Sequence, residues 1–149
     1  MVRRRTAALV GAVALIAAVF TGAGAGTAAA VDNGTRSASV GGWTCPGVAV
    51  PPGYVITMFN ISGCNGAGAW LQQPVRDGIW TCSGSPIVAG YVITNYDRNG
   101  CSGVGGWYHQ LVRNGIWTCP YSPIPAGYRS TTYDARGCSG LGAWLTIRA

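Results

Sequence analysis

Residues 78–114 read GIWTCSGSPIVAGYVITNYDRNGCSGVGGWYHQLVRN, and similar phrases precede them at 41–77 and follow them at 115–149. The three copies align without an insertion at a period of 37 residues, and 12 positions carry the same residue in every copy. Self-similarity at a fixed period of this length is typical of folds in which each copy forms one small structural unit. The sequence therefore predicts a single domain over 41–149 built from three equivalent repeats.

The segment before the repeats has the composition of an export signal. Three arginines at 3–5 precede an apolar stretch at 7–20, and alanines occupy 28–30. This order is typical of a cleaved secretory signal peptide, and the apolar stretch is too short to span a bilayer. We predict a secreted protein with a signal peptide over 1–30. Residues 31–40 are then a polar, flexible N-terminal arm, with a docking strand as the alternative.

Each copy contains two cysteines. They are Cys45, Cys64, Cys82, Cys101, Cys119 and Cys138. In a small exported domain, six cysteines predict three disulfides. Two schemes respect the repeat, one pairing cysteines within copies and the other between neighbouring copies. Loop entropy, about 3 kcal/mol for loops of either size, does not separate them. We favour pairing within copies, because it is possible whether or not the three repeats close into a ring.

Metal ions, cofactors and nucleic acids are not expected partners. Zinc sites usually contain cysteines two to four residues apart, and this spacing is absent while the chain has a single histidine. Beyond residue 30 there are seven arginines and four aspartates. The arginines are scattered along the sequence, whereas nucleic-acid-binding proteins concentrate basic charge on one face.

Two segments of the middle repeat have strand character. Residues 91–96 are rich in β-branched and aromatic side chains, and 107–113 form a second such run. Asn114-Gly115 then leads directly into 116–119, and Asn-Gly is a strong signal for a two-residue hairpin turn. We therefore predict an all-β fold without helices after residue 30. In it, the last strand of each copy pairs with the first strand of the next.

Strand pairing of this kind makes the repeats depend on one another. If the strand at 144–148 meets 41–45, the three units close around a pseudo-threefold axis in a prism-like fold. Closure removes free sheet edges, which otherwise invite aggregation. A linear array is the alternative. In both arrangements an isolated copy is not expected to fold.

The sequence offers few groups for catalysis. Glutamate is absent, and Asp97 and Asp134 follow predicted strands at equivalent positions, where an aspartate commonly stabilises a turn. His109 is the sole histidine, and its counterparts in the other copies are Gln72 and Thr146. No G-x-S-x-G nucleophile motif is present. We predict that the protein is not an enzyme.

The six tryptophans form two sets in register. We expect Trp43, Trp80 and Trp117 to pack in the core, because large rings must supply much of the buried area. The second set follows a glycine-rich loop that would let a flat ligand such as a sugar stack on a ring. Candidate binding residues in this set and beside it are Trp70, Trp107, Trp144, Tyr96 and Tyr133. Positions that differ between copies add Arg98, His109 and Arg129 as candidates for one asymmetric binding face.

These features favour a secreted, non-enzymatic protein that binds a glycan or cell-envelope polymer through several equivalent sites. The alternative is a factor directed at another secreted protein, such as a protease inhibitor, an antimicrobial effector or an adaptor subunit. Loops at 83–90 and 120–127 support this alternative, because their prolines reduce the entropy lost on binding. A purely structural extracellular protein is a third possibility.

Overall fold

The computed structural model describes residues 41–149, which belong to one compact unit, and the predicted signal peptide and arm lie outside the described residues. The first repeat contains the strands β1 (Gly42–Thr44), β2 (Tyr54–Asn60) and β3 (Ala69–Pro74). The second contains β4 (Ile79–Cys82), β5 (Tyr91–Asp97) and β6 (Gly106–Leu111). The third contains β7 (Ile116–Thr118), β8 (Tyr128–Asp134) and β9 (Ala143–Arg148). The predicted repeats and β class are confirmed.

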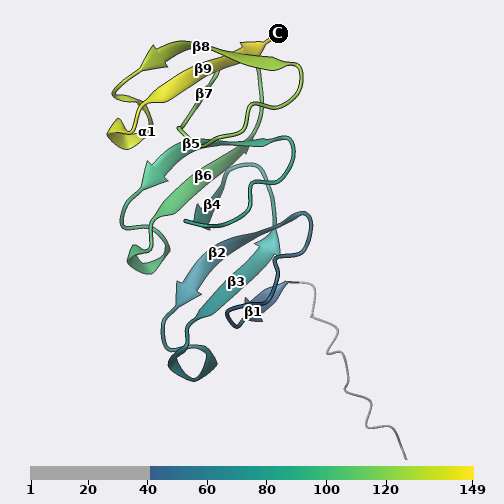
Figure 1. Cartoon of the computed structure of the whole chain (residues 1–149), viewed down its shortest axis with the longest axis vertical. Coiled ribbons are helices and arrows are strands. Elements are labelled where there is room, and N and C mark those ends of the chain that lie inside the picture. Colours follow the sequence, from purple (N-terminus) through teal and green to yellow (C-terminus); the bar gives the residue numbers. More distant parts are fainter. Residues whose placement is uncertain (1–40) are drawn as a thin grey trace, which may run out of the picture. The chain divides into compact units, whose positions relative to one another are not determined.

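Each repeat forms its own three-stranded antiparallel sheet, in which the third strand lies between the first and the second. The three sheets have the orders β1-β3-β2, β4-β6-β5 and β7-β9-β8 (Figure 1). A short helical turn begins at or beside the second cysteine of each repeat, as η1 (Cys64–Gly66), η2 (Cys101–Gly103) and α1 (Gly137–Gly140). The prediction that no helix follows residue 30 was therefore wrong by one turn in each repeat.

The predicted hairpins between repeats are not formed. Asp77 and Gly78 link β3 to β4, but β4 pairs with β6 of its own repeat. The Gly78 N–H donates to the His109 carbonyl at 3.0 Å, and the Leu111 N–H donates to Asp77 Oδ1 at 2.8 Å. These two bonds dock the linker on the central strand of the following sheet. Asp77-Gly78, which occupies the place of Asn114-Gly115 one repeat earlier, therefore forms a linker between two sheets and not a tight hairpin turn.

The predicted prism closure also differs from the structure, because the described residues contain no closed sheet. β9 pairs with β7 on one edge and β8 on the other, and β1 pairs with β3. A strand at the centre of its sheet has no free edge, so β9 cannot also pair with β1. Consecutive repeats instead meet through β2 with β4 and β5 with β7, as in the linear alternative.

All three disulfides lie within copies, as favoured from the sequence. They join Cys45 to Cys64, Cys82 to Cys101 and Cys119 to Cys138, with Cα–Cα distances of 5.6, 5.1 and 5.3 Å. Each bridge ties the end of the first strand to the helical turn before the third. Every repeat is thus stapled across the end of its own sheet.

The main core lies at the junction of the second and third repeats rather than inside either one. Ile93 of β5 is buried with Cys119, Cys138 and Ala143 of the third repeat. The Cys119 N–H donates to the Ile93 carbonyl at 2.8 Å, and the Ile93 N–H donates to Ser122 Oγ at 2.9 Å. The disulfide of one repeat therefore supplies the apolar surface that its neighbour packs against.

The first junction uses the same serine contacts. The Ile56 N–H donates to Ser85 Oγ at 2.8 Å, and Ser102 Oγ donates to the Phe59 carbonyl at 3.0 Å. In the first repeat, Val48 and Asn65 occupy the positions of these two serines. No preceding repeat is present among the described residues, so those positions have no junction to stabilise.

The outer repeat at the other end differs in the same way. Val92 and Ile93 are 0% and 3% exposed in β5, whereas Arg129 and Ser130 replace them in β8. Polar residues on an uncovered end repeat are the usual way in which a repeat protein prevents further stacking. Arg129 and Ser130 thus have the polar character expected of capping residues in the last described repeat.

Candidate functional site

His109 is buried beneath the sheet surface and is 1% exposed. Its Nε2 lies 3.1 Å from Thr81 Oγ1. In the first repeat Gln72 Nε2 donates to Thr44 Oγ1 at 3.1 Å, and the third repeat has a threonine pair in the same place. The residue at this position differs between copies but always hydrogen-bonds the threonine that follows the first tryptophan of its repeat. This position gives His109 a structural role.

The hydrogen bonds also define the tautomer of this histidine. Thr81 Oγ1 donates its proton to the Trp107 carbonyl at 3.3 Å, so the hydroxyl oxygen must accept from the His109 Nε2–H. His109 Nδ1 is then an unprotonated acceptor, and it has no partner within residues 41–149. Burial lowers the pKa of His109 from 6.5 to about 4, which keeps the ring neutral.

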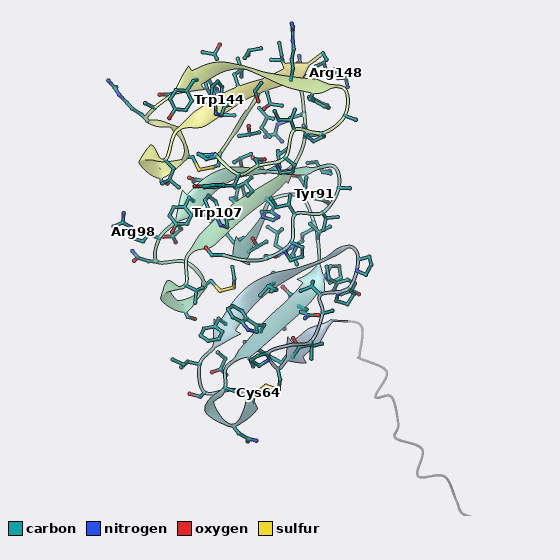
Figure 2. All side chains as sticks on the ribbon, viewed as in Figure 1. Cys64, Tyr91, Arg98, Trp107, Trp144 and Arg148 are labelled. Carbon is teal, nitrogen blue, oxygen red and sulfur yellow. A yellow bond between two sulfur atoms is a disulfide. The ribbon has the colours of Figure 1, made fainter. Side chains whose placement is uncertain are left out.

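The second tryptophan set forms one ring pair in each repeat, and Figure 2 labels Trp107 and Trp144 of this set. The centroid distances are 4.4 Å for Phe59–Trp70, 4.5 Å for Tyr96–Trp107 and 4.9 Å for Tyr133–Trp144. Tyr96 and Trp107 pack against the buried cluster that contains the disulfide of the third repeat. In the third repeat, Tyr133 and Trp144 are 51% and 41% exposed. The ring pair of the middle repeat therefore supports its neighbour, while the last pair faces solvent.

The three residues expected to form an asymmetric face are not brought together as one surface. His109 is buried, whereas Arg98 and Arg129 are exposed in the turn after β5 and in β8. Arg98 has Ile61 and Ala135 as its counterparts. Positions that differ between the three copies therefore include a buried residue and a residue of the last repeat, so such differences do not identify a binding face.

The prediction that the first tryptophan set packs in the core was wrong. Trp43, Trp80 and Trp117 are 51%, 43% and 40% exposed. In β4, Ile79 and Thr81 are buried and Trp80 lies between them. Successive side chains of a strand point to opposite faces, so burial of these two neighbours places the indole outside.

Each tryptophan of this exposed set lines a pocket. Trp43 and Met58 of the first repeat line one of about 370 Å³, to which Ser102 of the second repeat also contributes. Thr57 of the first repeat and Trp80 of the second line one of about 140 Å³. Thr94 and Trp117 line one of about 420 Å³ between the second and third repeats. The signal in the sequence that could have identified this exposed set is the threonine that follows each tryptophan. If the threonine side chain points to the buried face, the tryptophan before it must point outward.

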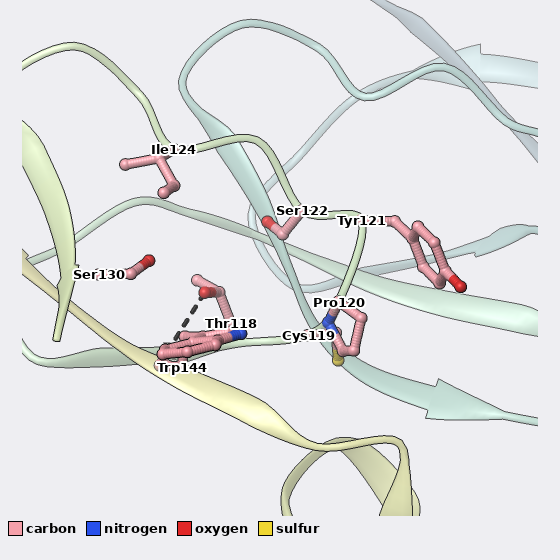
Figure 3. A pocket seen from close by; sticks show the side chains of 8 residues that line it. All are labelled: Thr118, Cys119, Pro120, Tyr121, Ser122, Ile124, Ser130 and Trp144. Carbon is pink, nitrogen blue, oxygen red and sulfur yellow. Dashed lines mark hydrogen bonds between the residues drawn. The ribbon is translucent and has the colours of Figure 1, made fainter. Parts of the chain in front are cut away.

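A further pocket of about 350 Å³ lies in the third repeat and includes Tyr121, Ile124, Ser130 and Trp144 (Figure 3). Tyr121 is 86% exposed and has a φ of 69°. The equivalent residues of the other repeats are glycines with φ near 88°. A tyrosine in this left-handed region costs about 1–2 kcal/mol, and no burial of its ring offsets that cost.

Within residues 41–149, no three His, Cys, Asp or Glu side chains gather into a group that could hold a metal ion. The same residues contain no helix that is both long and apolar enough to cross a membrane. No protein-family model, curated protein or solved structure matches this chain.

Proposed function

We propose that the chain is a secreted, non-enzymatic protein that binds a glycan or cell-envelope polymer through several weak, equivalent sites. The observation that carries this proposal is the exposure of Trp43, Trp80 and Trp117 at the same strand position of each repeat. An exposed indole offers a flat apolar face on which the C–H groups of a sugar ring can stack. A polymer repeats its own units, so it can occupy several such faces at once.

The disulfides support the extracellular part of this proposal. Three disulfides and no free cysteine within residues 41–149 suit an oxidising environment, because reducing compartments keep thiols reduced. We therefore assign ligand recognition to the first tryptophan set, in place of the second set favoured from the sequence. Trp107 is committed to a repeat junction, whereas Trp80 and its counterparts expose two fifths or more of their surface.

The test is retention on insoluble polysaccharides. The wild type and the variants Trp43→Ala, Trp80→Ala, Trp117→Ala and their triple combination are incubated with chitin, cellulose, xylan and peptidoglycan. We expect at least one polymer to retain the wild type, each single variant to be retained less, and the triple variant to stay in solution. The control is Leu111→Ala, which removes another exposed apolar side chain. A wild type that no polymer retains, or a triple variant retained equally well, would contradict the proposal.

A second candidate is a factor directed at another secreted protein, and Tyr121 favours it. Its exposed ring occupies a strained backbone position in a loop that also contains Pro120, Pro123 and Pro125. Proline rigidity lowers the entropy cost of presenting such a ring to a partner. This candidate predicts that Tyr121→Gly abolishes capture of a specific protein from the culture medium while the triple tryptophan variant retains it.

A further inference from the structure

The pocket between the second and third repeats is a groove built by both of them, and we call it the junction groove. Asn95 of β5 and Tyr108 and Gln110 of β6 line it from the second repeat. Arg113 lines it from the linker, and Trp117 of β7 lines it from the third repeat. The groove has a volume of about 420 Å³, which is a typical size for a small-molecule site.

The polar groups that this groove leaves unpaired are hydrogen-bond donors. Asn95 Oδ1 accepts from the Tyr96 N–H at 2.9 Å, and Ser139 Oγ, which donates to the Tyr96 carbonyl at 2.7 Å, lies 3.0 Å from the same Oδ1. Gln110 Oε1 accepts from Thr94 Oγ1 at 2.9 Å. Within residues 41–149, the two amide nitrogens have no partner, so each side chain keeps its N–H groups for a ligand.

Arg113 adds a positive charge to these donors. Its guanidinium has no ion-pair partner within the described part of the chain. Residues 41–149 contain six arginines and three aspartates, so this part of the chain carries a net positive charge. Guanidinium and amide N–H groups together match an acceptor with negative charge, and charge-assisted hydrogen bonds of this kind are about twice as strong as neutral ones.

We propose that the junction groove binds an anionic sugar unit, with a carboxylate or phosphate group at Arg113 and the sugar ring stacked on Trp117. This inference rests on the proposed glycan-binding function and names the class of glycan. Gln110 and Asn95 donate to the anion or to sugar oxygens beside it. The site needs both repeats, because the arginine and the amides come before the repeat boundary and the indole comes after it.

The first junction has equivalent residues for part of this set, although the pocket beside Trp80 is lined by Thr57 and Asp97 and not by Arg76 or Gln73. Thr57 Oγ1 donates to Gln73 Oε1 at 2.9 Å, and Arg76 and Trp80 occupy the positions of the arginine and the indole. Met58 and Leu71 stand where the second junction has Asn95 and Tyr108. This junction therefore has one amide donor fewer, and we expect it to bind the same ligand more weakly.

The experiment measures binding of tetragalacturonate and of its methyl ester by isothermal titration calorimetry, with poly(glycerol phosphate) as the phosphate arm. The ester keeps the sugar rings and removes the charge. We expect the wild type to bind the acid, the phosphate polymer or both at least about tenfold more tightly than the ester. Arg113→Gln should weaken that binding about tenfold or more. Arg136→Gln is the matched control, since it removes an equal charge from a loop outside the groove.

The outcomes separate this inference from the broader proposal. If Arg113→Gln and wild type bind the anionic probes equally, or if the ester binds as tightly as both anionic probes, the anionic site is wrong. If neutral polysaccharides retain the protein and none of the anionic probes binds, the anionic inference fails and the glycan proposal stands. If neither neutral nor anionic polymers bind, both fail. Circular dichroism of Arg113→Gln checks that the fold is kept. A folded variant with lower affinity assigns the loss to the arginine side chain.

Discussion

The Nε2 atom of His109 lies 3.1 Å from Oγ1 of Thr81. The other two repeats have Gln72 and Thr146 at the position of His109, and each hydrogen-bonds the equivalent threonine. The histidine is neutral in the folded protein because burial lowers its pKa to about 4. A charged imidazole at this site would be desolvated and would have to donate from both nitrogens. We therefore expect the stability of the middle repeat to depend on pH, because it has a histidine at this position.

The stability of the protein should fall as the pH is lowered from 7 to 5. The unfolded chain binds a proton at His109 near the ordinary histidine pKa of 6.5, and the folded chain does not until about 4. The unfolded state therefore gains about 2 kcal/mol over this range. Urea unfolding at pH 7 and pH 5 measures the difference. His109→Gln, which copies the first repeat, should lose most of this dependence, and an unchanged dependence would contradict the assignment.

The three disulfides should contribute unequally although their loops are identical in length. Each closes a sequence separation of 19, so loop entropy predicts about 3 kcal/mol for every bridge. Cys119 and Cys138 are 2% and 7% exposed at a junction, whereas Cys45 is exposed. Replacing both cysteines of a bridge by alanine should cost more at Cys119–Cys138 than at Cys45–Cys64. Chemical denaturation of the two variants checks this, and equal losses would show that junction packing adds nothing.

Restoring the internal sequence at the free edge should promote self-association. Arg129→Val combined with Ser130→Ile gives β8 the buried Val-Ile pair of β5, of which Ile93 lies in the junction cluster. An apolar edge without a covering repeat is expected to associate with other copies. Sedimentation velocity should show a concentration-dependent increase in the mean sedimentation coefficient. The opposite pair, Val92→Arg with Ile93→Ser, should disrupt the second junction, and stable monomers of both variants would argue against end capping.

Gly137→Ala should destabilise the third repeat, and a second change should rescue it. A Cβ at Gly137 would lie 2.4 Å from the Cβ of Ala143, which is buried. Overpacking of this kind typically costs about 1–3 kcal/mol. The middle repeat has Gly106 in place of Ala143, so Ala143→Gly should recover much of the loss in the double variant. Thermal unfolding of the single and double variants measures this coupling, and additive losses would refute direct contact.

Tyr121→Gly should leave stability unchanged or raise it by up to about 1 kcal/mol. Glycine removes the strain of a φ of 69°, and a ring that is 86% exposed contributes little packing. The increase is limited because glycine also makes the unfolded chain more flexible. Differential scanning calorimetry tests this expectation. A clear loss of stability would mean that the ring packs on the protein, which would weaken the case for a partner site.

The repeat boundaries, the strand at 91–96 and most of the strand at 107–113 were predictable from local patterns, because β-branched runs act over short distances. Cysteine spacing predicted three disulfides but left two pairing schemes open, and pairing within copies was only favoured. The arrangement of the sheets was not predictable in this way. Asp77 carries a turn signal, but its carboxylate is bound by the Leu111 N–H in the next sheet, and no local pattern shows that contact.

The candidate site was also only partly predictable from the sequence. Three exposed tryptophans could not be separated from the second set, which includes the junction residue Trp107, because both sets are equally regular in sequence. Which set is exposed depends on the threonines beside Trp43, Trp80 and Trp117, which turn inward to donate to the carbonyls of Trp70, Trp107 and Trp144.

The sequence by itself determined three stapled β repeats, because periodicity and cysteine spacing are properties of neighbouring residues. Only the tertiary structure decided that the sheets stay separate, that the core lies at their junctions, and that Arg113 and Trp117 share a groove. The physical reason is that the buried apolar cluster joins Ile93 of the second repeat to Cys119, Cys138 and Ala143 of the third, which lie far from it in the sequence. The side chains that this packing leaves exposed form the candidate surface.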